Sequence, residues 1–497
     1  MQDYIIGIDI GTGSTKAVAV NTRGDIIGTT QIHHSYIKNI DERAEQDPTL
    51  LLNAFYSSIK RIISDLGNLP SGISLSSAMH SIMAINEEGK PITNLILWSD
   101  NRSTKIAQQL RNDRSGQTIY KDTGTPIHAM SPLCKIIWWR ENEKETFSKA
   151  YKFISIKEFI WYCLFKEYAI DHSIASATGL FNIDTLSWNT ESLQMAQITT
   201  DHLSFPVPTV YHKTGIEKEA CKLSGLTPLI PVCIGASDGC LANLGTHSLK
   251  KGIAAITIGT SAAVRIASAV PIRNSANMIF NYILDYQTFI CGGPINNGGN
   301  VMDWIISNFL SSQEFGEDPY PRIFEIINKV PAGSEGLLFL PYIFAERSPV
   351  WDEKASGGFI GIKHIHTQAH FINSVIEGIC FALKEVLEII ENASGEIKEI
   401  HASGAFSKSR EWVQLLANVI NKPVVLAEIE DASAIGAAML GYAALGIKNE
   451  INHIQAQSIV IRPEESNAEV YSAFFAVYKT MYAGMKPTMD LLYKTLN

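Results

Sequence analysis

A chain of 497 residues is long enough for roughly two to four domains with large cores, at about 150 residues per domain. An apolar fraction of 46% argues against a disordered chain, and a net charge of -9 without a dense run of Lys or Arg argues against nucleic acid as a partner. The seven cysteines are scattered without a C-x-x-C pair, which predicts buried thiols in a reducing, cytoplasmic environment.

The N-terminus runs directly into a strand-like pattern, without the basic and apolar regions of a signal peptide, so we expect no export. Tyr4 to Asp9 predicts a strand, Gly11 to Thr15 a tight glycine-rich loop, and Lys16 to Val20 a second strand. A third strand begins near Asp25, after the turn Asn21 to Gly24. The opening of the chain therefore predicts an antiparallel meander whose first hairpin carries the glycine loop at its tip.

Several later segments repeat apolar residues at intervals of three and four, which is typical of amphipathic helices. They cover Pro48 to Leu66, Ile154 to Phe165 and Ala369 to Asn392. Ser433 to Gly446 is rich in Ala and Gly, which predicts a helix packed closely against another backbone, and we expect a hinge near Gly436. A terminal helix over Ala468 to Tyr482 is expected to present one apolar side, formed by Val470, Tyr471, Phe474, Phe475, Tyr478 and Tyr482. No apolar run approaches the roughly 20 residues that span a bilayer, so we expect no membrane segment.

The hairpin pattern recurs in the second half of the chain. Ile253 to Ile258 predicts a strand, Gly259-Thr260-Ser261 a loop, and Ala262 to Ala267 the returning strand. Two related halves predict two lobes with a cleft between them. We divide them into residues 1–246 and 247–497, where Gly245 and Lys250-Lys251 interrupt the apolar pattern.

Loops of Gly, Thr and Ser bind phosphate, because glycine lets backbone N–H groups approach the anion and hydroxyls add further donors. Asp9 precedes the first loop and suits a magnesium ion, while Lys16 could add positive charge. The chain contains neither a G-x-x-x-x-G-K-[ST] motif nor the third glycine of a dinucleotide fingerprint. A simple hairpin turn is the alternative for Gly11 to Gly13. The recurrence at Gly259 favours phosphate binding.

The motif Asp9-x-Gly11-Thr12-x-Ser14-x-Lys16 resembles the FGGY carbohydrate kinases. Met130 to Trp138 is similar to the first signature of that family, with Trp139 in place of an aliphatic residue, Phe or Met, and Gly357 to Glu377 is similar to the second at every specified position. Further similar stretches are Trp98-x-Asp100-x-Arg102, Gly235 to Gly239, Glu346 to Pro349 and Ser433 to Ala438. At Ala402 to Phe406 the chain departs from the longer glycine run that many members place under the adenosine. The resemblance covers about Tyr4 to Tyr442 and implies an α/β, two-domain, actin-like and ribonuclease H-like ATPase fold, with ATP and Mg²⁺ as cofactors.

The resemblance also implies a role for individual residues. Asp238, flanked by Gly235 and Gly239, is expected to act as general base on the substrate hydroxyl, although an Asp here could instead cap a following helix. Asp9 and Asp238 are expected to bind the magnesium, and Met79, through its backbone, and His80 the substrate. A core role is the alternative for His80. The expected phosphate and ATP contacts are Gly11, Thr12, Gly13, Ser14, Lys16, Gly259, Thr260, Gly299, Gly404 and Ala405.

Three short stretches, Ser76 to Ser81, Gly124 to His128 and Asn296 to Gly299, resemble the gluconate-phosphorylating branch of the family. They favour D-gluconate as substrate, with 6-phosphogluconate as product. A ketopentose such as xylulose is the alternative within the family, and a non-catalytic actin-like ATPase switch is the alternative outside it. The small-molecule substrate and ATP are the expected partners, together with a possible homodimer.

A gluconate carboxylate needs a cation or backbone N–H groups to match it. Arg102, Lys157 and His128 are the candidates, and the sequence does not rank them. Asp100 and Arg102 could instead form a structural ion pair, and Trp98 is expected in the core, with the wall of the substrate site as the alternative. We expect these three residues to support the site from behind the substrate contacts.

Overall fold

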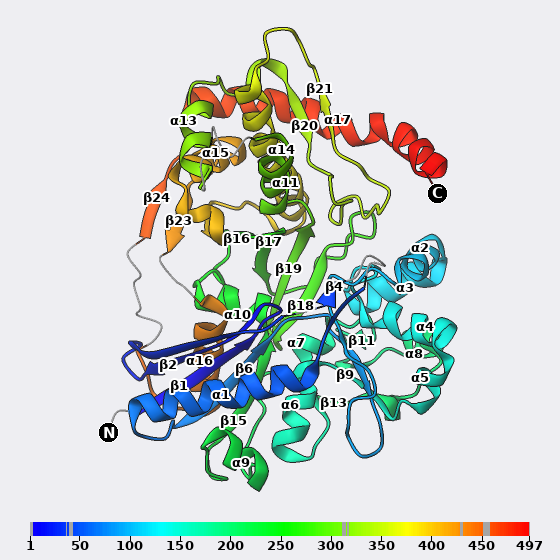
Figure 1. Cartoon of the computed structure of the whole chain (residues 1–497), viewed down its shortest axis with the longest axis vertical. Helices are drawn as coiled ribbons and strands as arrows, with labels where there is room; N and C mark the ends of the chain where they lie inside the picture. Colours follow the sequence, from blue (N-terminus) through cyan, green and yellow to red (C-terminus); the bar gives the residue numbers. More distant parts are fainter. Residues whose placement is uncertain are drawn as a thin grey trace. The chain divides into compact units, whose positions relative to one another are not determined.

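The computed structural model describes residues 3–35, 37–38, 43–310, 315, 318–427, 431–450 and 458–496. The chain divides into two compact units (Figure 1), each built from three segments. Unit 1 contains Met1–Leu249, Ala267–Cys291 and Ile429–Ala456, and unit 2 contains Lys250–Ile266, Gly292–Glu428 and Gln457–Asn497. The sequence division at residues 246 and 247 falls beside the first change of unit. The later changes from one unit to the other were not predicted from the sequence.

The main sheet of unit 1 has six strands in the order β14-β15-β6-β1-β2-β3. Strands β1, β2 and β3 form the predicted antiparallel meander, while β6 runs parallel to β1 and β15 runs parallel to β6. The carboxyl ends of β1, β6 and β15 therefore meet at one edge of the sheet. The strand bounds are β1 (Tyr4–Ile10), β2 (Ser14–Asn21), β3 (Ile26–His33), β6 (Gly72–Ser77), β14 (His212–Lys213) and β15 (Val232–Ser237).

Helices cover both faces of this sheet. Successive strand residues point to opposite faces: Ile6 and Ile8 pack in the core that contains Phe55 of α1 (Pro48–Leu66), whereas Ile5 packs with Ala438 of α16 (Ala432–Ala444). Figure 1 shows α1 (blue) lying along the meander. Helix α1 has the predicted bounds, because Asp47 caps its first turn and Gly67, with φ of 70°, ends it.

Helix α16 approaches its neighbours as closely as its Ala and Gly content predicts. A Cβ atom added to Gly436 would lie 2.0 Å from the Leu241 carbonyl oxygen of α10 (Asp238–Gly245), and one added to Gly7 of β1 would lie 1.9 Å from Ala434 O. Only glycine permits these backbone contacts. The prediction of a closely packed helix is confirmed.

The rest of unit 1 consists of short strands and helices. The strands are β4 (Ile37–Lys38), β5 (Ala44–Gln46), β7 (Met83–Ile85), β8 (Leu95–Ile96), β9 (Lys152–Ile154), β10 (Ala169–Asp171), β11 (Phe181–Asn182), β12 (Ser187–Trp188) and β13 (Phe205–Val207). The helices are α2 (Thr104–Asn112), α3 (Arg114–Thr123), α4 (Pro132–Asn142), α5 (Lys144–Lys149), α6 (Ile156–Phe165), α7 (His172–Ala175), α8 (Thr190–Ala196) and α9 (Lys218–Ser224). The predicted helix at Ile154 starts two residues later, because Ile154 ends β9 and Ser155 forms a capping box with Glu158.

The second large sheet repeats the topology of the first. Its order is β18-β19-β17-β16-β22-β23-β24, in which β16 pairs antiparallel with β17 and parallel with β22, as β1 does with β2 and β6. The predicted recurrence of the hairpin is therefore confirmed. The bounds are β16 (Ile253–Ile258), β17 (Ala262–Ser268), β18 (Phe280–Asp285), β19 (Thr288–Ile295), β22 (Glu399–Ser403), β23 (Val424–Ala427) and β24 (Ser458–Ile461).

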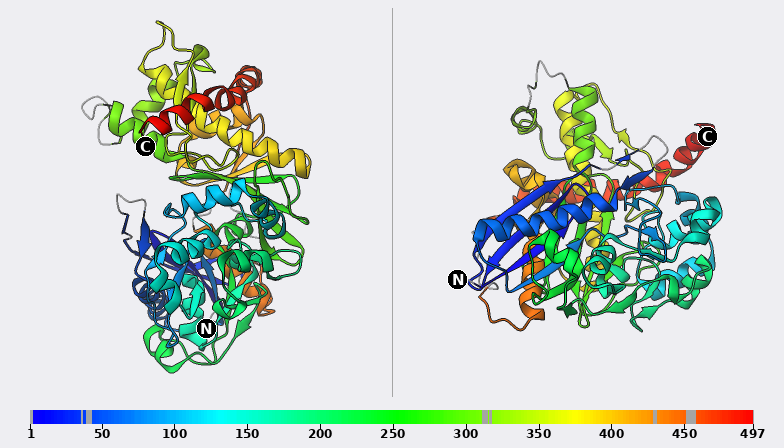
Figure 2. Two further views of the ribbon diagram at one scale, coloured as in Figure 1. Left: turned by 90° about the vertical axis from the view of Figure 1, so that its right-hand side faces the viewer. Right: turned by 60° about the horizontal axis from the view of Figure 1, so that its bottom comes forward.

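Two long helices pack together in unit 2, and Figure 2 shows them side by side in yellow and red. They are α14 (Gln368–Ser394) and α17 (Glu465–Leu496), joined where Phe381 contacts the rings of Tyr471, Phe475 and Tyr478. Val470 does not share that buried side, since it is 36% exposed. The remaining elements of unit 2 are α11 (Gly299–Phe309), α13 (Tyr320–Ile327), β20 (Leu338–Leu340), β21 (Gly358–Ile360) and α15 (Arg410–Ile420).

Candidate active site

Three polar residues meet at the carboxyl ends of the parallel strands of unit 1. Asp9 of β1 lies opposite Ser76 of β6, whose hydroxyl donates a hydrogen bond of 2.7 Å to Asp9 Oδ1. Asp238 follows β15 directly. Burial, and then the negative charge of Asp238, raise the pKa of Asp9 to about 7. Two carboxylates thus influence each other at one sheet edge, where ligands commonly bind in α/β folds.

Asp238 is the first residue of α10, but it is not the capping residue. Ser237 is the N-cap, and its hydroxyl accepts the Cys240 N–H, whereas Asp238 Oδ1 accepts the N–H of its neighbour Gly239. The side chain is partly exposed. The capping alternative for Asp238 is therefore wrong, because the preceding serine fills that position.

The first glycine loop borders a small cavity of about 170 Å³. The loop is closed by a hydrogen bond of 3.0 Å from Gly11 N–H to Ser14 O, and a Cβ atom on Gly13 would meet no other atom within 4 Å. Lys16 reaches across to Asp431, with 2.6 Å between Nζ and Oδ1. The cavity is lined by Asp9, Gly11, Gly13, Ser14, Lys16 and residues 431–434. It joins the hairpin tip to the first turn of α16.

Thr12 is not part of this lining. Its hydroxyl accepts the Trp98 indole N–H at 3.2 Å, and its carbonyl accepts the Gln46 side-chain amide at 2.7 Å. The two contacts fix the back of the glycine loop. Trp98, expected in the core, thus supports the loop.

The two expected substrate residues lie in the turn after β6. His80 has a left-handed backbone, with φ of 63°, and its Nε2 lies 3.0 Å from the hydroxyl of Tyr282. The His80 carbonyl accepts a bond of 2.7 Å from Lys135 Nζ, and Lys135 makes an equal bond to the Leu97 carbonyl. Burial lowers the pKa of Lys135 to about 7. The Met79 side chain packs against apolar neighbours, which leaves its backbone for polar contacts.

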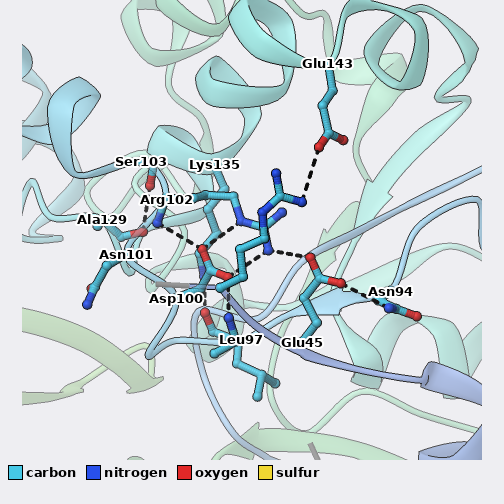
Figure 3. A network of polar contacts seen from close by, with 12 residues as sticks. Glu45, Asn94, Leu97, Asp100, Asn101, Arg102, Ser103, Ala129, Lys135 and Glu143 are labelled. Carbon is cyan, nitrogen blue, oxygen red and sulfur yellow. Dashed lines mark hydrogen bonds and ion pairs between the residues drawn. The ribbon is translucent and has the colours of Figure 1, made fainter. Parts of the chain in front are cut away.

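Arg102 lies at the centre of the ion network beside Lys135 (Figure 3). Its guanidinium bonds both oxygens of Asp100 at 2.8 Å and also pairs with Glu45. It lies over the ring of Trp138, 5.1 Å from the ring centre. This arrangement fixes the loop after Leu97, so the structural ion pair expected as an alternative for Asp100 and Arg102 is present.

Of the three cation candidates for a substrate carboxylate, two are engaged in buried ion pairs. Lys157 is wrong as a candidate, because its Nζ lies 2.6 Å from Asp171 and donates to Ala236 O, with only 2% of its side chain exposed. Arg102 is 4% exposed in its side chain and is held by its two carboxylates. His128 accepts the Met130 N–H through Nδ1 and is buried. Both Lys157 and Arg102 therefore serve the scaffold.

Unit 2 contains a larger cavity, of about 720 Å³, beside the second glycine loop. Gly259 N–H donates to Ser261 O at 2.9 Å, and Gly259 O accepts the N–H of Gly299, the first residue of α11, at 2.7 Å. Gly404 has φ of 103°, and a Cβ atom there would lie 2.3 Å from Ile258 O. The lining residues are Ile258, Gly259, Gly299, Asp318, Tyr320, Pro321, Phe324, Glu325, Asn328, Ala405, Phe406, Lys408, Ser409, Glu411 and Trp412. A lining of aromatic rings with a few polar groups is typical of a small-molecule site.

Residues 4–245 match the N-terminal domain of the FGGY family of carbohydrate kinases, and residues 254–445 match its C-terminal domain. The chain belongs to the FGGY carbohydrate kinases. It is therefore a phosphotransferase enzyme, and members of the family use ATP as phosphate donor. The alternative of a non-catalytic switch has no support.

The relatives of this FGGY kinase are named after different substrates, among them gluconate, xylulose and glycerol. The gluconokinase of Bacillus subtilis (strain 168) is 40% identical over 491 residues, which cover 96% of this chain and 95% of that protein. The xylulose kinase of Staphylococcus xylosus is 29% identical over 489 residues, covering 96% and 99%. A solved gluconate kinase from Lactobacillus acidophilus, 32% identical, superposes with a TM-score of 0.92 over 98% of both chains. The predicted α/β, two-domain fold of the actin-like ATPase type is confirmed.

The described residues of this FGGY kinase fit a magnesium ion that is bound by two carboxylates and by the phosphates of a substrate. Among the described residues there is no group of three or more His, Cys, Asp or Glu that could hold a metal. Magnesium is commonly bound through one or two carboxylates together with substrate phosphates, and Asp9 and Asp238 offer two. Burial first, and then the charge of Asp238, raise the pKa of Asp9, and a cation bound here would offset both effects.

Four features of this FGGY kinase were missed by the sequence analysis. They are Asp431, Tyr282, Lys135 and the aromatic wall of the larger cavity. Lys135 lies inside the Met130 to Trp138 signature, so the family resemblance included this residue but did not predict its role. Asp431 pairs with a residue 415 positions away, for which a single sequence gives no signal.

Among the described residues, no helix has the length and apolar character needed to cross a membrane.

Proposed function

We propose that the chain phosphorylates D-gluconate at the C6 hydroxyl, with ATP as donor, to give 6-phospho-D-gluconate and ADP. The observation that supports gluconate as the substrate is the 40% identity to proteins named gluconokinase over nearly the whole chain, against 29% to the xylulose kinase of Staphylococcus xylosus. The ketopentose alternative keeps support from a ligand-bound xylulose kinase of Lactobacillus acidophilus, 31% identical with a TM-score of 0.93.

We assign the proton transfer to Asp238. The C6 oxygen attacks the γ-phosphorus, the bond from that phosphorus to the bridging oxygen of ADP breaks, and the hydroxyl proton passes to the Asp238 carboxylate. Partial exposure lets an alcohol reach this side chain, which follows β15 at the same sheet edge as Asp9. Met79 and His80 hold the substrate in the turn after β6.

We assign the binding of ATP, the phosphate donor, to the two glycine loops. Gly11 to Ser14 with Lys16 meet the transferred phosphoryl group, and Gly259 and Thr260 meet the phosphates of the nucleotide. Gly299 and Ala405 line the cavity that also contains Phe324 and Trp412, and we assign them to the nucleotide site together with Gly404, which directly precedes Ala405. Asp9 and Asp238 would hold magnesium, which supplies charge neutralisation for the phosphate oxygens.

A coupled assay of ADP release across gluconate, xylulose, ribulose and glycerol tests the substrate. We expect kcat/KM for gluconate to exceed that for each other compound by at least about a hundredfold, the discrimination that buried polar contacts can supply. A higher value for xylulose would transfer the assignment to a ketopentose kinase.

The variant Asp238→Asn tests the base. It keeps the shape of the side chain but accepts no proton, so kcat should fall at least roughly a hundredfold while the binding of ATP by the glycine loops is retained. Asp47→Asn is the matched control, because Asn also caps helices and Asp47 lies at the start of α1. Near-normal turnover by Asp238→Asn would exclude Asp238 as the base.

A further inference from the structure

Glu346 is a buried carboxylate that the proposed reaction does not use. It is 2% exposed, and burial raises its pKa to about 7. It accepts three N–H groups: Asn296 N–H at 2.6 Å, Arg347 N–H at 2.8 Å and the Asn297 side-chain amide at 2.9 Å. A buried carboxylate with three donors fixes the backbone that carries them, since each unmatched donor would be expensive in this environment.

The segment before Glu346 adds further bonds to the same two asparagines. Asn297 Oδ1 accepts the Phe344 N–H at 3.0 Å, and Asn297 Nδ2 also donates to the Ala345 carbonyl at 2.6 Å. Asn296 Nδ2 donates to the Phe344 carbonyl at 3.0 Å. Residues 344–346 therefore hold residues 296–297 through side chains as well as backbone.

The two asparagines lead directly into the backbone that supports the second glycine loop. Gly299 N–H donates to Gly259 O, and Asn300 N–H donates to Thr260 O at 3.1 Å. A Cβ atom on Gly298 would lie 2.8 Å from the Ser261 carbonyl carbon, and one on Gly299 would lie 2.8 Å from Gly259 O. The two backbones touch, so a shift of residues 296–299 moves residues 259–261.

We propose that Glu346 is a positioning residue for the nucleotide: through Asn296 and Asn297 it sets the place of Gly298 and Gly299, and through them the phosphate-binding loop at Gly259. This role rests on the proposed function of that loop. It predicts that loss of the Glu346 carboxylate weakens the binding of nucleotide phosphates and leaves the binding of the sugar acid unchanged.

Unit 2 supplies a matched control in Glu377 of α14. This carboxylate is 1% exposed and also has its pKa raised to about 7 by burial. It accepts Gly333 N–H, the Ser334 hydroxyl, the Asn373 amide and the Tyr471 hydroxyl at 2.8 to 2.9 Å. Its partners lie outside the glycine loops and outside the lining of the larger cavity.

The experiment compares Glu346→Gln and Glu377→Gln in the full chain, by calorimetric Kd for MgADP, by KM for gluconate and by Tm. Both variants should lose thermal stability, because each places an amide N–H against buried donors. Only Glu346→Gln should raise Kd for MgADP, by roughly tenfold, the factor that corresponds to about 1.4 kcal/mol. KM for gluconate at saturating ATP should stay within about twofold in both, and Glu346→Asp, which keeps the charge, should recover part of the affinity.

An unchanged Kd in Glu346→Gln, or an equal rise in Glu377→Gln, would overturn the positioning role. If Glu346→Gln does not fold, Glu346→Asp decides: a shortened carboxylate should raise Kd without changing KM for gluconate, and an unaltered Kd would contradict the proposal. A wild-type chain that binds MgADP but does not phosphorylate gluconate would overturn the proposed substrate alone, and the comparison of Kd values would still decide the role of Glu346.

Discussion

Lys135 shows how one buried side chain can join two functional loops. Its ammonium donates to the carbonyls of His80, in the turn that we assign to the substrate, and of Leu97, in the loop that carries Trp98. Trp98 in turn bonds Thr12 at the back of the glycine loop. Lys135, for which we expect no contact with the substrate, therefore positions the residues that we assign to substrate binding.

Replacing Lys135 by methionine should raise KM for gluconate by roughly tenfold, because two buried carbonyls lose their donor and the His80 turn relaxes. Steady-state kinetics at saturating ATP measure this effect. Lys384→Met is the control, since Lys384 is also buried, has its pKa lowered by burial and donates to the Val419 carbonyl in unit 2. It should lower Tm without changing KM for gluconate. Equal changes in KM for both variants would reduce Lys135 to a general packing role.

At the scale of elements, α16 links the strand that carries Asp9 to the helix that carries Asp238. It lies against β1 at Gly7 and against α10 at Gly436, and the hydroxyl of Ser433 in its first turn donates to Asp238 O at 3.2 Å. Its N-terminal end also carries Asp431, the partner of Lys16. The small residues of α16 thus determine how close these functional groups come.

The variant Gly436→Ala should destabilise the chain by about 2 kcal/mol or more and reduce kcat, because the added methyl group would overlap the Leu241 carbonyl and move α16 away from α10. Denaturant unfolding and steady-state kinetics measure the two effects. Gly484→Ala in α17 is the control, where the methyl group meets no atom within 4 Å and alanine favours the helix by up to about 1 kcal/mol. A stable, fully active Gly436→Ala variant would contradict the close packing.

At the scale of the whole molecule, the chain passes between its two units five times, because each unit is made of three segments. Helix α16 belongs to unit 1 although it follows most of unit 2 in the sequence. A fragment that ends at residue 246 therefore lacks the helix that covers Ile5, Val18 and Val20 on one face of the main sheet.

We expect the fragment 1–246 to show no cooperative thermal transition and to bind a hydrophobic dye, because that apolar face is exposed to water. Circular dichroism during heating measures the transition. The same fragment joined to residues 429–456 by a flexible linker should regain cooperativity to a measurable extent. A sharp transition in the shorter fragment would show that α16 is dispensable for the fold of unit 1.

Local patterns in the sequence determined much of this protein. The meander, the recurrence of Gly-Thr-Ser loops after apolar strands, and the helices at Pro48 and Gln368 depend on residues close together in the chain, so spacing and turn chemistry predicted them. The family motifs pointed to Asp9 and Asp238, and the structure places both at one sheet edge. Their catalytic roles stay proposals.

The tertiary structure alone decided which charges are available and which are paired. Lys157 was a candidate for binding the substrate carboxylate, but in the fold it pairs with Asp171. Lys16 pairs with Asp431 only because α16 returns to the first sheet. The division of each unit into three segments also depends on contacts between residues far apart in the chain. Such contacts join residues far apart in the chain, and their energy comes from burial and pairing that no local pattern records.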